Sequence, residues 1–191
     1  HKFQDKYKAL GWCTFLLREL ERVSAPYLLV ESHTTVTVPP LAEPSFENIV
    51  RVDLKVPHLP IQEPLVVGSE YLPAVCRVLF CNLSRVAVLA KEVEFFSFPS
   101  VWSVVDDSDY ADEIGWFLQH YLAVFRQLAE VEPNQAKAEI QTWPRDEFSL
   151  FGQLRLYLYE SVNIFEYGDV EHFLVNLSQE LLWNYNSRPT L

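Results

Sequence analysis

Residues 72–89 read LPAVCRVLFCNLSRVAVL, and this stretch decides the class of fold. Its apolar side chains recur at intervals of three and four residues, which places them along one wide face of a helix. The polar residues Arg77, Asn82 and Arg85 fall off that face. A helix whose apolar face is this wide packs against more than one neighbour. The stretch therefore predicts a long helix in the centre of the fold.

Helical patterns of the same kind precede and follow this stretch. They run over residues 3–23, 114–128, 133–143, 148–162, 170–177 and 178–185. The connections between the later patterns are only a few residues long, and short connections make neighbouring helices antiparallel. We therefore predict a mainly α fold of stacked antiparallel helical hairpins, which is a degenerate α-solenoid.

Residues 27–64 interrupt the helical patterns with frequent prolines. Within them, residues 50–56 alternate apolar and charged side chains, and residues 35–38 alternate threonine and valine. A period of two predicts strands, and two short strands are stable only with a helical layer beneath them. We predict a small extended or β insertion at 27–64, within a single helical domain 1–191 whose core helical array spans 67–191.

The chain has no methionine and begins with His1, almost inside a helical pattern. A segment excised from a solenoid would begin and stop in this way. We therefore expect the chain to be a piece of a longer protein.

The composition excludes several classes of protein. Hydrophobic residues make up 49% of the chain, which is too many for a disordered protein. The chain has 15 Lys and Arg against 26 Asp and Glu, a formal net charge of -11, and no basic run that would bind nucleic acid. The apolar runs are shorter than the ~20 residues of a membrane span. Cys13, Cys76 and Cys81 lie in apolar helical patterns, which suits a reducing cytoplasm. We expect a cytoplasmic protein without a nucleic-acid or membrane partner.

One acidic cluster precedes the helical pattern at 114–128. It consists of Asp106, Asp107, Asp109, Asp112 and Glu113. Closely spaced carboxylates suit Mg²⁺ or Ca²⁺, but the cluster lacks the glycine and the final Glu of a calcium-binding loop. Acidic residues are also favoured at a helix N-terminus, and we favour this helix-capping interpretation. The sequence assigns no metal and no cofactor, and a metal-dependent enzyme that uses residues 106–113 is an alternative.

The histidines and cysteines form no catalytic pattern. His33, His58, His120 and His172 are scattered, without a spacing that places two imidazoles on one helix face. A couple between Cys13 and His33 or His58 is disfavoured, because the apolar helix around Cys13 disfavours a thiolate. The chain also has no glycine-rich phosphate loop. We predict no catalytic residue and no enzymatic activity.

Two further features are interpreted as structural. The tryptophans are Trp12, Trp102, Trp116, Trp143 and Trp183. Large aromatic side chains at helix junctions usually fill the space between helices, and we favour packing over a ligand groove. The glycosylation-type sequences at 82–84 and 176–178 lie in or beside helices and are interpreted as coincidental.

The second half of the chain carries a family resemblance in its packing motifs. These motifs are the acidic entry Asp106-Asp107, Gly115-Trp116 early in a long helix, Glu132-Pro133 before an alanine-rich helix that ends in Trp143, and Arg155-Leu156 within residues 146–159. In them the chain resembles the helical tails of very large bacterial antiphage defence proteins. Those tails follow an effector module, such as a sirtuin-type NAD-consuming domain or a signal-transducing ATPase, and are degenerate HEAT-like α-solenoids. The resemblance implies a tail that holds partners or senses phage components.

These observations together predict a noncatalytic scaffold or recognition segment that binds a protein partner or other domains of the parent chain. Exposed aromatic side chains with few polar residues between them favour such binding. The predicted partner-binding residues are Phe95, Phe96, Phe98 and Trp102. An oligomerisation domain, in which the same apolar faces meet a second copy, is an alternative.

Overall fold

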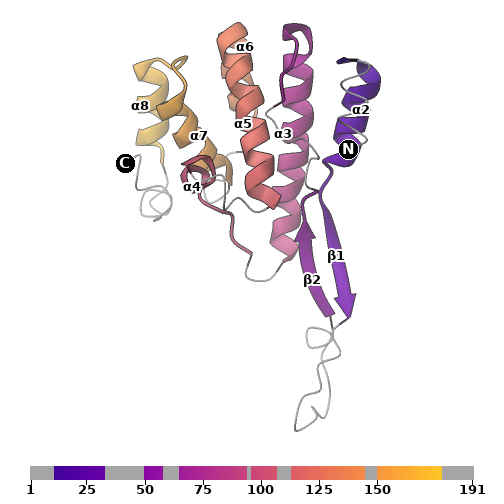
Figure 1. Cartoon of the computed structure of the whole chain (residues 1–191). Helices are drawn as coiled ribbons and strands as arrows, with labels where there is room; N and C mark the ends of the chain where they lie inside the picture. The colour runs from indigo at the N-terminus through magenta and orange to yellow at the C-terminus, as the bar shows by residue number, and fades with distance from the viewer. Residues whose placement is uncertain are drawn as a thin grey trace.

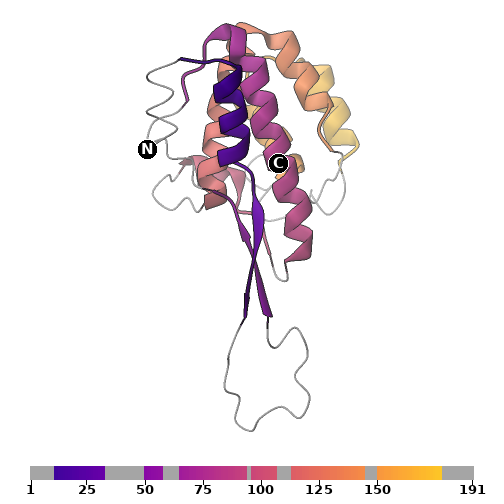
Figure 2. The same ribbon diagram turned by 90° about the vertical axis from the view of Figure 1, so that its right-hand side faces the viewer.

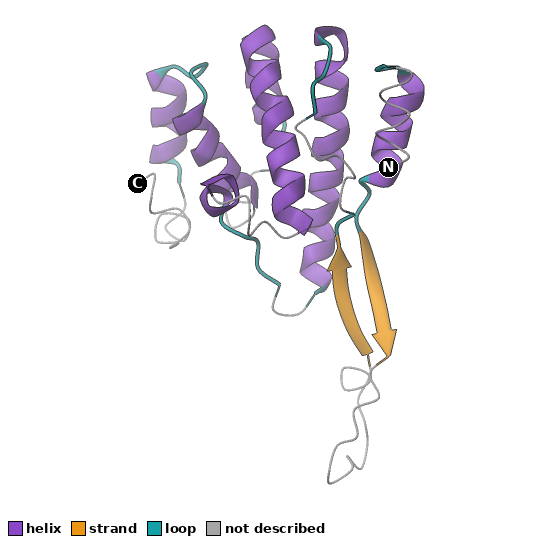
Figure 3. Cartoon of the chain, viewed as in Figure 1, coloured by secondary structure: helices purple, strands orange, loops and turns teal. Residues whose placement is uncertain are grey.

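The computed structural model describes residues 11–32, 50–57, 65–93, 96–106, 113–144 and 150–177. These residues are mainly helical, with one small antiparallel sheet of two strands (Figure 3). The predicted mainly α class and the small β element within 27–64 are therefore confirmed. The helices are α2 (Thr14–Val23), α3 (Leu72–Leu89), α4 (Val101–Asp106), α5 (Glu113–Val131), α6 (Pro133–Gln141), α7 (Leu150–Ser161) and α8 (Tyr167–Val175), and the strands are β1 (Tyr27–Ser32) and β2 (Val50–Lys55).

The helix predicted to be central is α3. In Figure 1 the helices form a row, with α2 at one end, α8 at the other, and α3 between α2 and α5. Its buried residues are Leu72, Val75, Cys76, Leu79, Phe80, Asn82, Leu83 and Val86. The apolar face of α3 is wide because two neighbours, α2 and α5, cover it.

The helices α2 and α3 run in the same direction, unlike the predicted antiparallel hairpins. The Trp12 indole Nε1 donates a 3.0 Å hydrogen bond to the carbonyl of Val66, just before α3. Asn82 Nδ2, in the middle of α3, donates a 3.0 Å hydrogen bond to the carbonyl of Glu21, near the end of α2. The start of α2 thus lies beside the start of α3, and the end of α2 lies beside the middle of α3. The strands between them carry the chain away from the helices and back again, so no direct helical turn joins the pair (Figure 1).

Side-chain amides hold the irregular segments against the helices. Gln127 of α5 accepts a 3.1 Å hydrogen bond from the backbone N–H of Val67 and donates a 2.7 Å hydrogen bond to the carbonyl of Leu65. Gln153 of α7, which is buried, accepts a 3.3 Å hydrogen bond from the N–H of Val101 at the start of α4. These bonds satisfy backbone groups that have no partner in regular secondary structure.

The pairs α5–α6 and α7–α8 follow short connections, as predicted. Glu132 alone joins α5 to α6, and Pro133 occupies the first turn of α6, where its missing N–H removes no helical bond. A capping box opens α8, because Glu166 and Asp169 each accept a hydrogen bond from the other's backbone N–H. The turns that begin these two helices are therefore encoded locally.

The strands β1 and β2 form an antiparallel ribbon whose register pairs Tyr27 with Lys55 and Ser32 with Val50. The strand at 50–55 was predicted. Its partner is β1. Residues 35–38, which were predicted to form the other strand, lie outside the described residues. A test for alternation misses β1, because Leu28, Leu29 and Val30 form a continuous apolar run. Figure 2 shows the two strands crossing and projecting beyond the helices.

Trp143 is the aromatic centre of the core, with 2% of its surface exposed. Its ring centroid lies 5.9 to 6.2 Å from those of four other rings, which come from α3, α5 and α7. These rings belong to Phe80, Tyr121, Phe125 and Phe151. The packing interpretation is confirmed for this tryptophan, which joins three helices that are far apart in sequence.

The segment Ser69–Glu92, which is α3 with its flanking 3-10 turns, has 24 residues and is apolar enough to cross a membrane by length and composition. It is the one such helix in the described part of the chain. By length and composition this segment differs from the prediction that every apolar run is too short for a membrane span, although Arg77 and Arg85 interrupt it. Core helices meet the same test, and the cover provided by α2 and α5 accounts for the composition of α3.

Candidate functional site

The four aromatic residues predicted to bind a partner differ in their exposure. Trp102 is 8% exposed, and its Nε1 donates a 3.2 Å hydrogen bond to Glu160 Oε2. The prediction that Trp102 is an exposed contact is therefore wrong, because the side chain completes the core between α4 and α7. The rings of Phe96 and Phe98 lie edge to face, 5.1 Å apart, and are half-buried against the core. Phe95 lies outside the described residues, and partner binding at Phe96 and Phe98 stays a prediction.

The acidic cluster lies largely outside the described residues, which include Asp106, the last residue of α4, and Glu113, the first of α5. Glu113 lies in the first turn of its helix, where an acidic side chain is favoured. Among the residues described, no three His, Cys, Asp or Glu side chains are grouped to hold a metal ion. The favoured helix-capping interpretation of residues 106–113 and its metal-site alternative both remain untested for residues 107–112, which lie outside the described residues.

The structure separates the other candidate residues. His120 is buried in α5, with its ring 5.4 Å from that of Trp116, whereas His172 is exposed on α8. Cys13 is half-buried at the start of α2, and His33 and His58 lie outside the described residues. The amide of Asn82, in the first glycosylation-type sequence, is buried and bonded to the end of α2.

The described residues line an open hollow that the sequence did not predict. It lies between α6 and α8 over the C-terminal half of α7 and has a volume of about 660 Å³, with an adjoining lobe of about 380 Å³. We call it the α6–α8 groove. Its lining is Ile140, Gln141, Arg155, Tyr159, Asp169, His172, Phe173 and Asn176, to which the lobe adds Lys137, Phe165 and Gly168.

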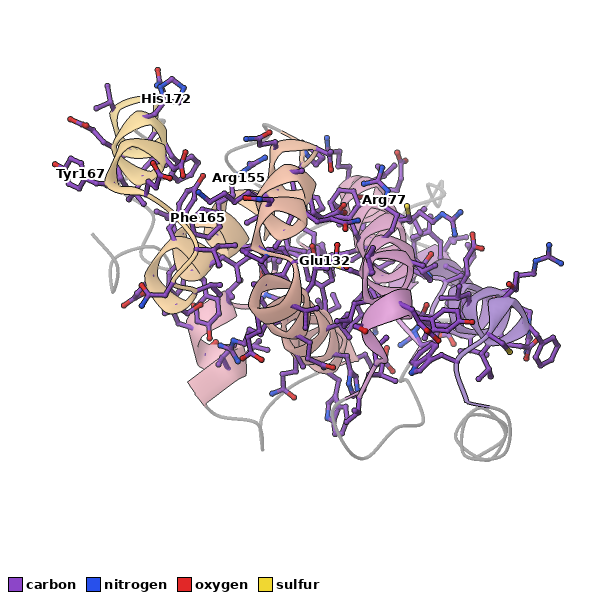
Figure 4. The ribbon with its side chains drawn as sticks, turned by 90° about the horizontal axis from the view of Figure 1, so that it is seen from above. Arg77, Glu132, Arg155, Phe165, Tyr167 and His172 are labelled. Atoms are coloured by element: carbon purple, nitrogen blue, oxygen red, sulfur yellow. The ribbon has the colours of Figure 1, made fainter. Side chains whose placement is uncertain are left out.

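Three aromatic rings form one wall of the groove. The Tyr159 ring lies edge to face with Phe165, at 4.6 Å between centroids, and 5.2 Å from Phe173. Figure 4 shows Tyr167 on the opposite side of α8, pointing away from the other helices. The groove-facing side of α8 therefore packs on α7, while Tyr167, which is 81% exposed, does not.

The charged side chains of the groove are already compensated within the chain. Lys137 Nζ lies 3.3 Å from Asp169 Oδ2 and 3.9 Å from Glu166 Oε1. The backbone N–H of Glu166, followed by Lys137, lowers the pKa of Asp169, so this carboxyl is ionised at neutral pH. The guanidinium of Arg155 donates hydrogen bonds of 2.8 and 3.0 Å to the carbonyls of Trp143 and Pro144. The groove thus carries no strong excess of either charge.

Three polar side chains of the groove are accessible to a ligand. The Gln141 amide, the Tyr159 hydroxyl and the His172 imidazole make no hydrogen bond to any other described residue. Burial raises the pKa of Tyr159, an effect that the guanidinium of Arg155 opposes and the carboxylate of Asp169 reinforces. The hydroxyl therefore stays protonated at neutral pH and is available as a donor. These groups come from three different helices, one each from α6, α7 and α8.

Sequence reasoning had no signal for this convergence. In the sequence His172 is one of several scattered histidines, and Gln141 and Tyr159 belong to amphipathic patterns that look like ordinary helix surface. The local signal that does exist is the Glu166–Asp169 capping box, which fixes where α8 begins. The distance from α8 to α6 is decided by packing on α7.

Comparison with protein-family models, with curated proteins and with solved structures gives no match for this chain. The geometry of the α6–α8 groove is therefore the main evidence that bears on function.

Proposed function

We propose that the chain is a noncatalytic recognition segment that binds an extended peptide of a protein partner in the α6–α8 groove. The observation that carries this proposal is the set of three polar groups, on Gln141, Tyr159 and His172, that make no hydrogen bond to a described residue, in a groove whose charged side chains already have partners within the chain. Side-chain hydrogen-bond donors and acceptors of this kind match the N–H and C=O groups of a peptide backbone.

The remaining lining fits the side chains of a peptide. Ile140 and Phe173 provide apolar surface beside the polar groups, and sites with apolar walls and few polar groups fix both affinity and orientation. A phosphate or nucleotide would need basic groups to neutralise it. In this groove Lys137 is paired with carboxylates and Arg155 donates to backbone carbonyls, so a peptide is the better match.

The proposal also includes the kind of parent protein that the family resemblance implies. We place the segment in a large bacterial defence protein of the cytoplasm, as part of a degenerate α-solenoid in which α5–α6 and α7–α8 are successive hairpins. The peptide then belongs to a partner protein or to another domain of the parent chain. The parallel pair α2–α3 stands apart from this repeat.

Selection of peptides tests the proposal. A phage-displayed library of random 12-residue peptides is selected against the full chain, and the enriched peptides are measured by fluorescence anisotropy. We expect Tyr159→Phe, Gln141→Ala and His172→Ala each to weaken binding about fivefold, because one hydrogen bond contributes about 1 kcal/mol. Arg18→Ala, on the exposed surface of α2, is the control and should leave affinity unchanged.

Two results would overturn the proposal. One is a selection that enriches no peptide above background. The other is a set of enriched peptides that bind the three groove variants as tightly as the parent chain.

A further inference from the structure

The β-ribbon, residues 27–32 and 50–55, projects from the helices and has exposed apolar side chains. Figures 1 and 2 show it projecting past the ends of the helices. Tyr27 and Val30 of β1 are 52% and 60% exposed. An isolated ribbon of two strands is only marginally stable in water. A sheet of three or more strands with an apolar face can be stable without other support. Each strand also has an outer edge that pairs with no other strand in the described part of the chain.

The charged residues of β2 make its outer edge a better candidate for strand pairing than the outer edge of β1. Arg51 and Asp53 lie two residues apart, hence on the same face of the strand, and Arg51 Nε lies 2.8 Å from Asp53 Oδ1. Val50, Val52 and Leu54 occupy the other face. The charged residues of this strand are Arg51, Asp53 and Lys55, and the first two are opposite in sign and placed symmetrically about Val52.

This symmetry makes β2 complementary to a second copy of itself. When two β2 strands pair antiparallel about a two-fold axis at Val52, Arg51 of each copy lies opposite Asp53 of the other. Val50 then lies opposite Leu54. Opposite charges and apolar side chains directly across from each other stabilise a strand pair. A two-fold axis at Arg51 or Asp53 would instead place like charges opposite each other at the centre.

We propose that the chain forms a two-fold dimer through β2, which joins two ribbons into one sheet of four strands in the order β1–β2–β2–β1. The interface is isologous, because the same patch is used on both copies. β1 lacks the required pattern, since Glu31 is its one charged residue and has no opposite charge to face in a second β1. The dimer uses a different part of the fold from the α6–α8 groove and does not depend on peptide binding.

Charge exchange tests the proposed register. The mass of the full chain is measured by size-exclusion chromatography with multi-angle light scattering over a range of protein concentrations. The parent chain should be dimeric at high concentration. Arg51→Asp and Asp53→Arg should each be monomeric, because two like-charged contacts replace two attractive ones, and the double variant R51D/D53R should dimerise again. Arg22→Asp on α2 is the control and should keep the dimer.

A disulfide probe tests the axis directly and does not depend on the charges. In the proposed dimer Val52 faces Val52 of the second copy, at a spacing that a disulfide can bridge. Val52→Cys should therefore form a covalent dimer on mild oxidation. Val30→Cys, which lies across from Val52 on β1, should not, because β1 is the outer strand of the sheet.

The proposal fails if the parent chain is monomeric at every concentration, or if R51D/D53R remains monomeric while circular dichroism shows it folded. Equal cross-linking of V52C and V30C would also overturn it. Each variant is checked for folding by its thermal melting curve, so that a loss of dimer is not confused with a loss of structure.

Discussion

The guanidinium of Arg155 lies over the ring of Trp143, with its central carbon 5.7 Å from the ring centroid, and donates a 2.8 Å hydrogen bond to the Trp143 carbonyl. A second bond, of 3.0 Å, reaches the carbonyl of Pro144. One side chain of α7 thus holds the end of the α6 segment in place. The same side chain lies beneath the α6–α8 groove, so the core and the groove share this contact.

Arg155→Met should destabilise the fold by about 3–6 kcal/mol, because two hydrogen bonds are lost. Each hydrogen bond to a charged group contributes about 1.5–3 kcal/mol, and the two carbonyls lose their donor. Urea denaturation followed by circular dichroism measures the change. Arg22→Met is the control, because Arg22 is exposed on α2 and its side chain pairs with Glu19 at the surface, where a change of less than about 1 kcal/mol is expected. If the two variants lowered the free energy of unfolding equally, the hydrogen bonds of Arg155 would contribute no more to stability than a surface ion pair.

Asn82→Ala should loosen α2 and cost about 1–3 kcal/mol. The buried Asn82 amide donates to Ser24 Oγ at 2.7 Å and to the carbonyl of Glu21, groups that would be left without this donor. Hydrogen exchange should then accelerate in α2 more than in α5. Asn176→Ala is the matched control, because that amide bonds at the surface of α8. Unchanged exchange in α2 would rule out a role of Asn82 in anchoring it.

Stability should fall in alkaline solution because of Cys76. Burial, with a smaller contribution from the carboxylate of Glu139, raises the pKa of this thiol far above its ordinary value. The unfolded thiol loses its proton from about pH 8.5, whereas the folded thiol keeps it. The unfolded state then binds fewer protons, so the free energy of unfolding decreases as the pH rises, by up to about 1.4 kcal/mol per pH unit.

Cys76→Ala should flatten this decrease between pH 8.5 and 10, as measured by urea denaturation at several pH values. Val78→Ala in the same helix keeps the thiol and should show the slope of the parent chain. A Cys76→Ala slope equal to that of the parent would contradict the assignment to Cys76.

Asp169 should make the melting temperature depend on pH in acid. Its pKa is lowered in the folded state, so its contribution is present above the ordinary Asp value of about 3.9 and is lost as the pH falls through the folded pKa. Asp169→Asn keeps an acceptor for the Glu166 N–H but loses the charge facing Lys137. We expect a lower melting temperature than the parent at pH 7 and no difference near pH 2. Glu171→Gln, exposed on the same helix, should melt like the parent at both values.

Tyr159→Phe should leave stability within about 0.5 kcal/mol of the parent, since the hydroxyl has no hydrogen bond to any described residue and the ring contacts with Phe165 and Phe173 remain. The same variant should bind selected peptides more weakly. This separation of binding from stability is what a site residue produces, and a large loss of stability would instead assign the hydroxyl a structural role.

The parts of the fold that could be predicted are those encoded by spacing along the chain. The helical face of residues 72–89 and the alternation of residues 50–55 both appear in the structure where the patterns place them. Trp102 was wrongly predicted to be exposed. Its burial depends on contacts with Tyr157 and Glu160 of α7, which are more than 50 positions away in the sequence. The α6–α8 groove was not predicted, because its lining residues share no local pattern.

The sequence by itself determined the helical class, the central helix and one strand, because hydrophobic periodicity is a property of consecutive residues. The tertiary structure alone decided that α2 runs parallel to α3, that Asn82 meets Ser24 from 58 positions away, and that Gln141, Tyr159 and His172 face one groove. Such contacts depend on how whole helices pack, and the packing energy is shared among many side chains that no short stretch of sequence contains.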